Sequence, residues 1–255
     1  MAVDEAILEH IGRRESLPTL RLYAWEPACL SLGYAQPYAD VDERGLKTKG
    51  WEVVRRPTGG RAILHTDELT YSVIAPLSEP RVYGKVLESY RRLSTALLEA
   101  LHMLGLDARA EKEHALPASQ PSIGPVCFEV PSDYEITVDG KKLIGSAQAR
   151  RKEGVLQHGS LPLAGDLTRI TQVLTFPSQD ERHSAAERLL TRAITVENIL
   201  GRAISFQQAS QCFVCGFERA LDLVFEIRDL SDGERQRAAE LVAVKYAHPT
   251  WTERV

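Results

Sequence analysis

The chain has 255 residues, of which 44% are hydrophobic and 26% are charged, as in an ordinary globular protein. Its formal net charge of −4 argues against bulk nucleic-acid binding, which usually needs a basic excess. No apolar run approaches the roughly 20 residues of a membrane span, and the acidic start MAVDEA is unlike a signal peptide. We therefore expect a cytoplasmic protein with no membrane or nucleic-acid partner, folded as one domain over residues 1–255.

The first half of the chain alternates predicted helices with short strands. The expected elements are a helix over 2–13, strands over 20–24 and 28–32, a helix over 41–49, strands over 52–56, 62–64 and 70–74, and a helix over 86–104. The last helix has the clearest pattern, because apolar residues recur at helical spacing and Gly105 follows as a stop.

The second half begins with a proline-rich stretch over residues 112–125, which we expect to be a surface loop. Asp139-Gly140 is a preferred two-residue turn and predicts a hairpin. The expected strands are 134–138, 142–147, 155–158 and 160–163, and the sequence beyond residue 167 is mostly helical. Strands interleaved with helices and antiparallel hairpins favour an α+β fold of mixed, largely antiparallel sheets flanked by helices.

The four cysteines are too few for a disulfide scaffold in a chain of this length. Cys212 and Cys215 form a C-x-x-C pair within an amphipathic pattern, with no second C-x-x-C or histidine pair to complete a zinc site. We predict that they pack in the core, and we expect no metal. Cys127 stands beside apolar residues, which by itself favours buried packing over chemistry.

The segment RRPTGGRAILH, residues 55–65, contains a Gly59-Gly60 turn with arginines on both sides. Paired glycines leave backbone N–H groups free to approach a ligand. Arg55, Arg56 and Arg61 would add cationic donors suited to a phosphate or a carboxylate. A tight hairpin with solvated arginines is the alternative.

This segment and several others together resemble the lipoate and biotin protein ligase superfamily, most closely its single-domain octanoyl-[acyl carrier protein]:protein N-octanoyltransferases. The matching pieces run from Met1 to about Tyr246 and are MAVDEAIL, RLYAWEPACLSLGY, RRPTGGRAILH, ELTYS, the CF at residues 127–128, PSDYE, GKKLIGSAQ and LQHGS. The resemblance implies the catalytic-domain fold of that superfamily. Its members usually carry a strand before the MAVDEAIL helix. Since this chain starts inside that motif, either the start codon is misplaced or an edge strand is absent.

The resemblance implies transfer of an octanoyl group from octanoyl-acyl carrier protein to a lysine of a lipoyl domain, typically the glycine cleavage H protein, with no cofactor. Cys127 aligns with the acyl-thioester cysteine and Lys142 with the lysine of the family. A thiolate makes the transfer two easier displacements, and a nearby cation favours the thiolate. Strand alternation turns Lys141 and Lys142 to opposite faces, so only one can reach the site. Otherwise both lysines are solvated hairpin residues.

The matching motifs also predict the residues around the acyl group. The expected substrate-binding residues are Tyr34, Arg56, Thr58, Gly59, Gly60, Arg61, His65, Val73, Gly145, Ser146, Ala147, His158 and Gly159. An apolar slot for the octanoyl tail would be lined by Tyr34, Val73, Ile144 and Leu156. Backbone at 59–60, 145–146 and 158–159 would supply N–H donors to the acyl oxygen. His65 and His158 are either general bases or, in the reading we favour, residues that line the pocket or orient backbone.

The sequence is also compatible with other functions. An ATP-dependent lipoate–protein ligase would share the fold and the lysine but would need no cysteine, and ligases tend to have a third glycine where this chain has Arg61. An amidotransferase between lipoyl domains would also use a cysteine, whereas a non-enzymatic binding module would use none. The cluster Arg150-Arg151-Lys152 is either a solubilising turn or a docking site for an acidic carrier protein or its phosphopantetheine phosphate.

Overall fold

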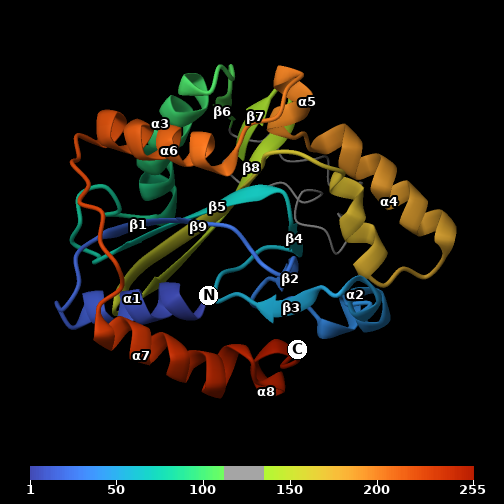
Figure 1. The fold of residues 1–255 in the computed structure, drawn as a ribbon, viewed down its shortest axis with the longest axis horizontal. Coiled ribbons are helices and arrows are strands. Elements are labelled where there is room, and N and C mark those ends of the chain that lie inside the picture. Colours follow the sequence, from blue (N-terminus) through green and yellow to red (C-terminus); the bar gives the residue numbers. More distant parts are fainter. Residues whose placement is uncertain (112–134) are drawn as a thin grey trace.

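The computed structural model describes residues 1–111 and 135–255 (Figure 1). Cys127 and the predicted loop over 112–125 lie outside the described residues. The helices are α1 (Ala2–Gly12), η1 (Tyr38–Asp40), α2 (Glu43–Lys49), α3 (Val86–Met103), η3 (Leu167–Val173), α4 (Gln179–Arg192), α5 (Val196–Leu200), α6 (Phe206–Leu221), α7 (Asp232–Leu241), η4 (Val242–Tyr246) and α8 (Pro249–Thr252). The strands are β1 (Thr19–Tyr23), β2 (Cys29–Leu32), β3 (Glu52–Arg55), β4 (Ile63–His65), β5 (Glu68–Ala75), β6 (Arg109–Glu111), β7 (Glu135–Val138), β8 (Lys141–Arg151) and β9 (Gly154–Pro162).

The larger sheet has six antiparallel strands in the order β1-β5-β9-β8-β7-β6. Helices α3 and α6 cover one face, where Tyr71 of β5 packs with Phe213 and Phe217 of α6 in the main core. Helix α1 covers the other face through Ile7 and Leu8, and α7 packs against α1 (Figure 1). The sheet therefore lies between two helical layers.

The smaller sheet has the order β3-β2-β4, with β2 parallel to β3 and antiparallel to β4. Its apolar side chains pack with residues of α2, η3 and α4 in a second core. The predicted α+β class with mixed, largely antiparallel sheets is confirmed.

Turn chemistry accounts for the hairpin between β7 and β8. Asp139 has φ 50° and Gly140 has φ 74°, as a two-residue turn with positive φ at both positions requires. Strand β9 differs from prediction, because it runs unbroken from Gly154 to Pro162 where two strands were expected. Gly159 does not interrupt the strand. Instead it makes room for Tyr71, whose Cε1 would lie 2.6 Å from a Cβ at this position.

Side-chain caps fix several helix starts. Helix α2 begins at Glu43, two residues later than predicted, because the Asp42 side chain accepts from the N–H of Gly45. Ser205 caps α6 in the same way, and Cys212 of that helix packs against the main core as predicted. Within residues 1–111 and 135–255, no helix is long and apolar enough to cross a membrane.

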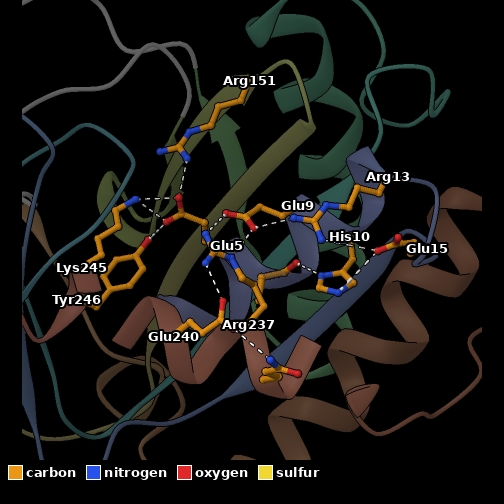
Figure 2. A network of polar contacts seen from close by, with 12 residues as sticks. Glu5, Glu9, His10, Arg13, Glu15, Arg151, Arg237, Glu240, Lys245 and Tyr246 are labelled. Carbon is orange, nitrogen blue, oxygen red and sulfur yellow. Dashed lines mark hydrogen bonds and ion pairs between the residues drawn. The ribbon is translucent and has the colours of Figure 1, made fainter. Parts of the chain in front are cut away.

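A network of ion pairs, called here the α1 network, ties the C-terminal helices to α1 and β8 (Figure 2). Glu5 of α1 accepts hydrogen bonds from Arg151 of β8 at 2.9 Å and from Lys245 of η4 at 2.6 Å. Glu9 pairs with Arg237 of α7 at 2.7 Å. Each of these basic side chains has a carboxylate partner, so the network holds the C-terminal segment on the fold.

Candidate active site

A cavity of about 710 Å³ lies between the two sheets. It is lined by β2 and β4 of the small sheet, by β5, β8 and β9 of the large sheet, and by the loops at 34–36 and 56–61. The predicted residues that line it are Tyr34, Arg56, Thr58, Gly59, Gly60, Arg61, His65, Lys142, Gly145, Ser146, Ala147, His158 and Gly159. Motifs spread over more than 120 residues of sequence thus meet at one place.

Three predicted apolar lining residues do not lie on this cavity. Val73 of β5 packs against the main core with Tyr71, on the face covered by α3 and α6. Ile144 belongs to the same core, and Leu156 packs against α1. The prediction for Val73 is corrected because strand alternation turns Thr70 toward the cavity and Tyr71 and Val73 away from it.

Two of the three arginines of the Gly-Gly turn, Arg55 and Arg56, are not solvated. Arg56 is 3% exposed and donates to the carbonyl oxygens of Gly59 at 3.0 Å and Arg61 at 2.6 Å. Arg55 is fully buried and donates to the carbonyl oxygens of Gly33 at 2.8 Å and of Thr252 at 2.9 Å. These two guanidinium groups hold loop carbonyls in place, so their main role is structural, namely to fix the wall of the cavity.

A chain of hydrogen bonds at the cavity floor links an acid, a histidine and a serine. His65 Nδ1 lies 2.7 Å from Glu68, and His65 Nε2 lies 2.8 Å from Ser31 Oγ. This order matches a Ser-His-acid nucleophile, but Ser31 has no exposed surface for a substrate carbonyl to approach. Since Arg56 donates to Ser31 Oγ at 3.1 Å, the chain instead buttresses Arg56. Both His65 nitrogens are occupied, which favours the orienting reading over general base.

His158 is buried and its burial lowers its pKa to about 3. It is therefore neutral at pH 7 and too weak a base for proton abstraction there. Nε2 lies 2.6 Å from Thr58 Oγ1, whereas Nδ1 is buried with no hydrogen-bond partner in the described parts of the chain.

The two hairpin lysines lie on opposite faces, as alternation predicts. Lys142 lines the cavity, is 4% exposed and donates to Glu135 of β7. Lys141 lies outside and donates to the Leu190 carbonyl at 2.9 Å. A solvated Lys142 is therefore excluded. Glu135 is a partner that the sequence alone did not identify, although it belongs to the quoted PSDYE motif.

Backbone N–H donors are available at two of the three predicted places. Strand β9 is paired with β5 and β8 on both sides of residues 158–159, so those N–H groups are used in the sheet and the prediction for them is wrong. Beyond Ile144, no described strand pairs with the outer edge of β8, which leaves one N–H of residues 145–146 facing outward. The N–H groups of Gly59 and Gly60 donate to no described residue.

The polar floor of the cavity was not predicted from the sequence. Glu68, Thr70 and Ser72 stand at every second position of an otherwise apolar strand, a signal that could have revealed a polar face on β5. Glu68 also accepts from Thr70 and from Ser160 of β9, so this carboxylate fixes several lining side chains at once.

The described cysteines do not line the cavity. Cys29 is buried, and burial raises its pKa to about 12, so its thiol stays protonated. Cys212 and Cys215 lie on α6, where Cys212 packs against the main core behind the larger sheet. None of these three thiols is placed to attack a molecule in the cavity.

Comparison with known families places the site in context. Residues 1–218 match the family model described as lipoyl protein ligase A/B catalytic domain. The octanoyltransferase LipM of Kyrpidia tusciae is 42% identical over 100% of this chain and 93% of its own length. The octanoyltransferase LipM of Geobacillus kaustophilus is 38% identical over 98% of this chain and 92% of its own length.

Two solved structures have the same fold. The bi-partite lipoate protein ligase of Thermoplasma acidophilum, described with its E2 lipoyl domain, superposes with a TM-score of 0.79 at 24% identity, covering 98% of this chain and 91% of that one. A lipoate-protein ligase A bound with ATP superposes with a TM-score of 0.75 at 24% identity, covering 99% and 94%.

Proposed function

The chain belongs to the lipoyl protein ligase A/B catalytic-domain family, and from this we propose that it moves an octanoyl group from an acyl carrier protein, through a thioester on Cys127, to a lysine of a lipoyl domain. The activity class follows from the full-length octanoyltransferase relatives: the protein is an octanoyltransferase of lipoate biosynthesis. The acceptor we favour is the glycine cleavage H protein, and the compartment is the cytoplasm.

The buried Lys142 at the cavity is the observation that carries the proposal. Its ammonium group lies next to Glu135 in a cavity whose other described charged side chains are all arginines. A cation at such a place favours a thiolate nearby and can exchange protons with it. Because the described cysteines do not line the cavity, Cys127 is the candidate thiol that the sequence provides.

The proposed reaction has two displacements. The Lys142 ammonium group first holds Cys127 as a thiolate, and the thiolate attacks the thioester carbonyl of the donor. The new C–S bond forms as the carrier sulfur leaves, and that sulfur takes a proton from Lys142, which becomes a neutral amine. The amine of the acceptor lysine then attacks the enzyme thioester, the C–N bond forms, and the C–S bond to Cys127 breaks. Lys142 accepts the proton that the amine loses.

Intact-mass spectrometry after incubation with octanoyl-acyl carrier protein tests the covalent step. We expect one octanoyl adduct on the wild type and none on Cys127→Ala. Cys215→Ala is the matched control and should keep the adduct. An adduct that persists in Cys127→Ala contradicts the assignment of the nucleophile, and a wild type with no adduct contradicts the mechanism.

Transfer to a lipoyl domain separates the remaining alternatives. We expect faster modification from octanoyl-acyl carrier protein than from free octanoate with ATP and magnesium. The reverse order would make the protein a ligase. Modification only from an already octanoylated lipoyl domain would make it an amidotransferase.

A further inference from the structure

The charged side chains among the described lining of the cavity are all basic, namely Arg56, Arg61, Lys142, Arg150 and Arg151. This holds in a chain whose net charge is −4. With no carboxylate among the described lining residues, the cavity has a positive potential that favours an anionic ligand. An octanoyl group is neutral, so the potential has to serve another part of a substrate.

Most of these cations already have partners within the protein. Arg56 donates to loop carbonyls, Lys142 to Glu135, and Arg151 to Glu5. Arg150 donates to the carbonyl of Val82 at 3.1 Å. The Arg61 side chain, by contrast, has neither a hydrogen bond nor an ion pair with any described residue.

Arg254 likewise has no carboxylate partner among residues 1–111 and 135–255. Its guanidinium carbon lies 3.7 Å from the ring centre of Tyr34, a cavity-lining residue that is 42% exposed. Trp251 packs edge-on against the same ring at 6.0 Å. Arg254 thus lies beside a residue of the cavity lining, on the C-terminal segment beyond the residues that the family model matches.

Arg61 and Tyr34, whose ring contacts Arg254, lie on two cavity-lining loops that touch each other. The N–H of Tyr34 donates to the carbonyl of Thr58 at 2.8 Å. A Cβ on Gly33 would lie 1.8 Å from the carbonyl oxygen of Gly60, so the two loops are in direct contact. A hydrogen bond with Arg254, together with the charges of Arg254, Arg151 and Lys245, lowers the pKa of the Tyr34 phenol. The electrostatic potential at the Tyr34 hydroxyl is therefore positive.

We propose that Arg61, on the Gly-Gly turn, and Arg254, on the C-terminal segment next to Tyr34, together bind the phosphate of the phosphopantetheine arm that carries the octanoyl group. This inference rests on the proposed function, because it takes the acyl donor to be a carrier protein with such an arm. Guanidinium groups suit a phosphate, since they donate several hydrogen bonds to it with full charge. The Tyr34 hydroxyl supplies a further donor beside Arg254.

Ligand binding tests this site independently of catalysis. In a Cys127→Ala background, calorimetry compares octanoyl-phosphopantetheine with octanoyl-pantetheine, which differ only in the phosphate. We expect the phosphorylated ligand to bind about 10- to 100-fold more tightly, as two charge-assisted contacts imply. Arg61→Ala and Arg254→Ala should each reduce that preference about tenfold, and Arg61→Lys should restore part of it.

Arg228→Ala is the matched control, because this exposed arginine is paired with Glu226 and should leave the preference unchanged. Equal affinity for the two ligands, or a preference that survives both arginine changes, overturns the proposal. The proposal is also overturned if Arg61→Ala weakens the binding of intact carrier protein only, since the anion that Arg61 contacts would then be the acidic surface of that protein. Failure of acyl transfer would contradict the proposed function, but the binding measurement could still be interpreted.

Discussion

Arg61 in the cavity and the basic residues of the α1 network differ in whether a carboxylate faces them. In the network, Arg237 lies on Glu9, and Arg151 and Lys245 converge on Glu5 (Figure 2). In the cavity, Arg61 has no described carboxylate partner, and the described lining has no acidic residue. A charge that is neutralised within the fold contributes to stability, whereas one left without a counter-charge is available to a ligand. Substitutions in the two regions should therefore change different measurements.

The largest effect should come from Lys142 in the cavity. We predict that Lys142→Ala slows octanoyl transfer by about 10²- to 10⁴-fold, because it removes the proton-exchanging group. Lys141→Ala is the control and should leave the rate nearly unchanged, because that side chain bonds to the Leu190 carbonyl outside the cavity. Single-turnover transfer to a lipoyl domain is the measurement.

Lys142→Ala also leaves the buried Glu135 without the ammonium group that it pairs with. The double variant Lys142→Ala/Glu135→Gln removes that unpaired charge and should recover stability but not the transfer rate. A double variant with a near wild-type rate would show that Lys142 acts through folding alone.

Glu5 in the network should affect stability first. We predict that Glu5→Gln lowers the free energy of unfolding at pH 7 by about 2 kcal/mol, because charged hydrogen bonds from Lys245 and Arg151 lose their acceptor charge. Urea denaturation is the measurement, and Glu187→Gln is the exposed control. Equal urea midpoints for Glu5→Gln and the wild type would show that the network does not contribute to the stability of the fold.

The same pair of proteins gives a pH test. Burial acts to raise the pKa of Glu5, but hydrogen bonds from Lys245 and Tyr246 and nearby charges outweigh it and lower the pKa below 4.5. A lowered folded-state pKa stabilises the protein above the unfolded value and ceases to do so as pH falls through the folded value. The stability difference between wild type and Glu5→Gln should therefore be constant near neutral pH and shrink below about pH 4.5. A difference that grows on acidification would contradict this.

The smallest effect should be that of Arg61 on stability. We predict that Arg61→Ala changes the free energy of unfolding by less than about 0.5 kcal/mol, because its side chain has no described partner to lose. Arg237→Ala, the matched change in the network, should cost about 1 kcal/mol. Equal losses for the two variants would remove the distinction between the regions.

Much of the fold was predictable from local patterns. Helix α3 follows from its apolar spacing and the β7–β8 hairpin from Asp139-Gly140, because period and turn chemistry act over a few residues. The break expected at Gly159 was wrong, since the reason for that glycine is Tyr71 on a neighbouring strand. The placement of Val73 was wrong for a similar reason: the motif identifies the strand, and only the packed helices show which face is the core.

The sequence by itself determined the α+β class, the family and the motifs that supply the cavity, because these depend on neighbouring residues and on the order of short segments. The tertiary structure decided which partner each charged side chain has. Arg55 bonds to Thr252, Arg254 lies on Tyr34, and Glu135 pairs with Lys142. The first two pairs join residues about 200 positions apart, and electrostatic interactions depend on distance in space. Whether an arginine shapes a wall or is available to a ligand is therefore fixed only when the chain folds.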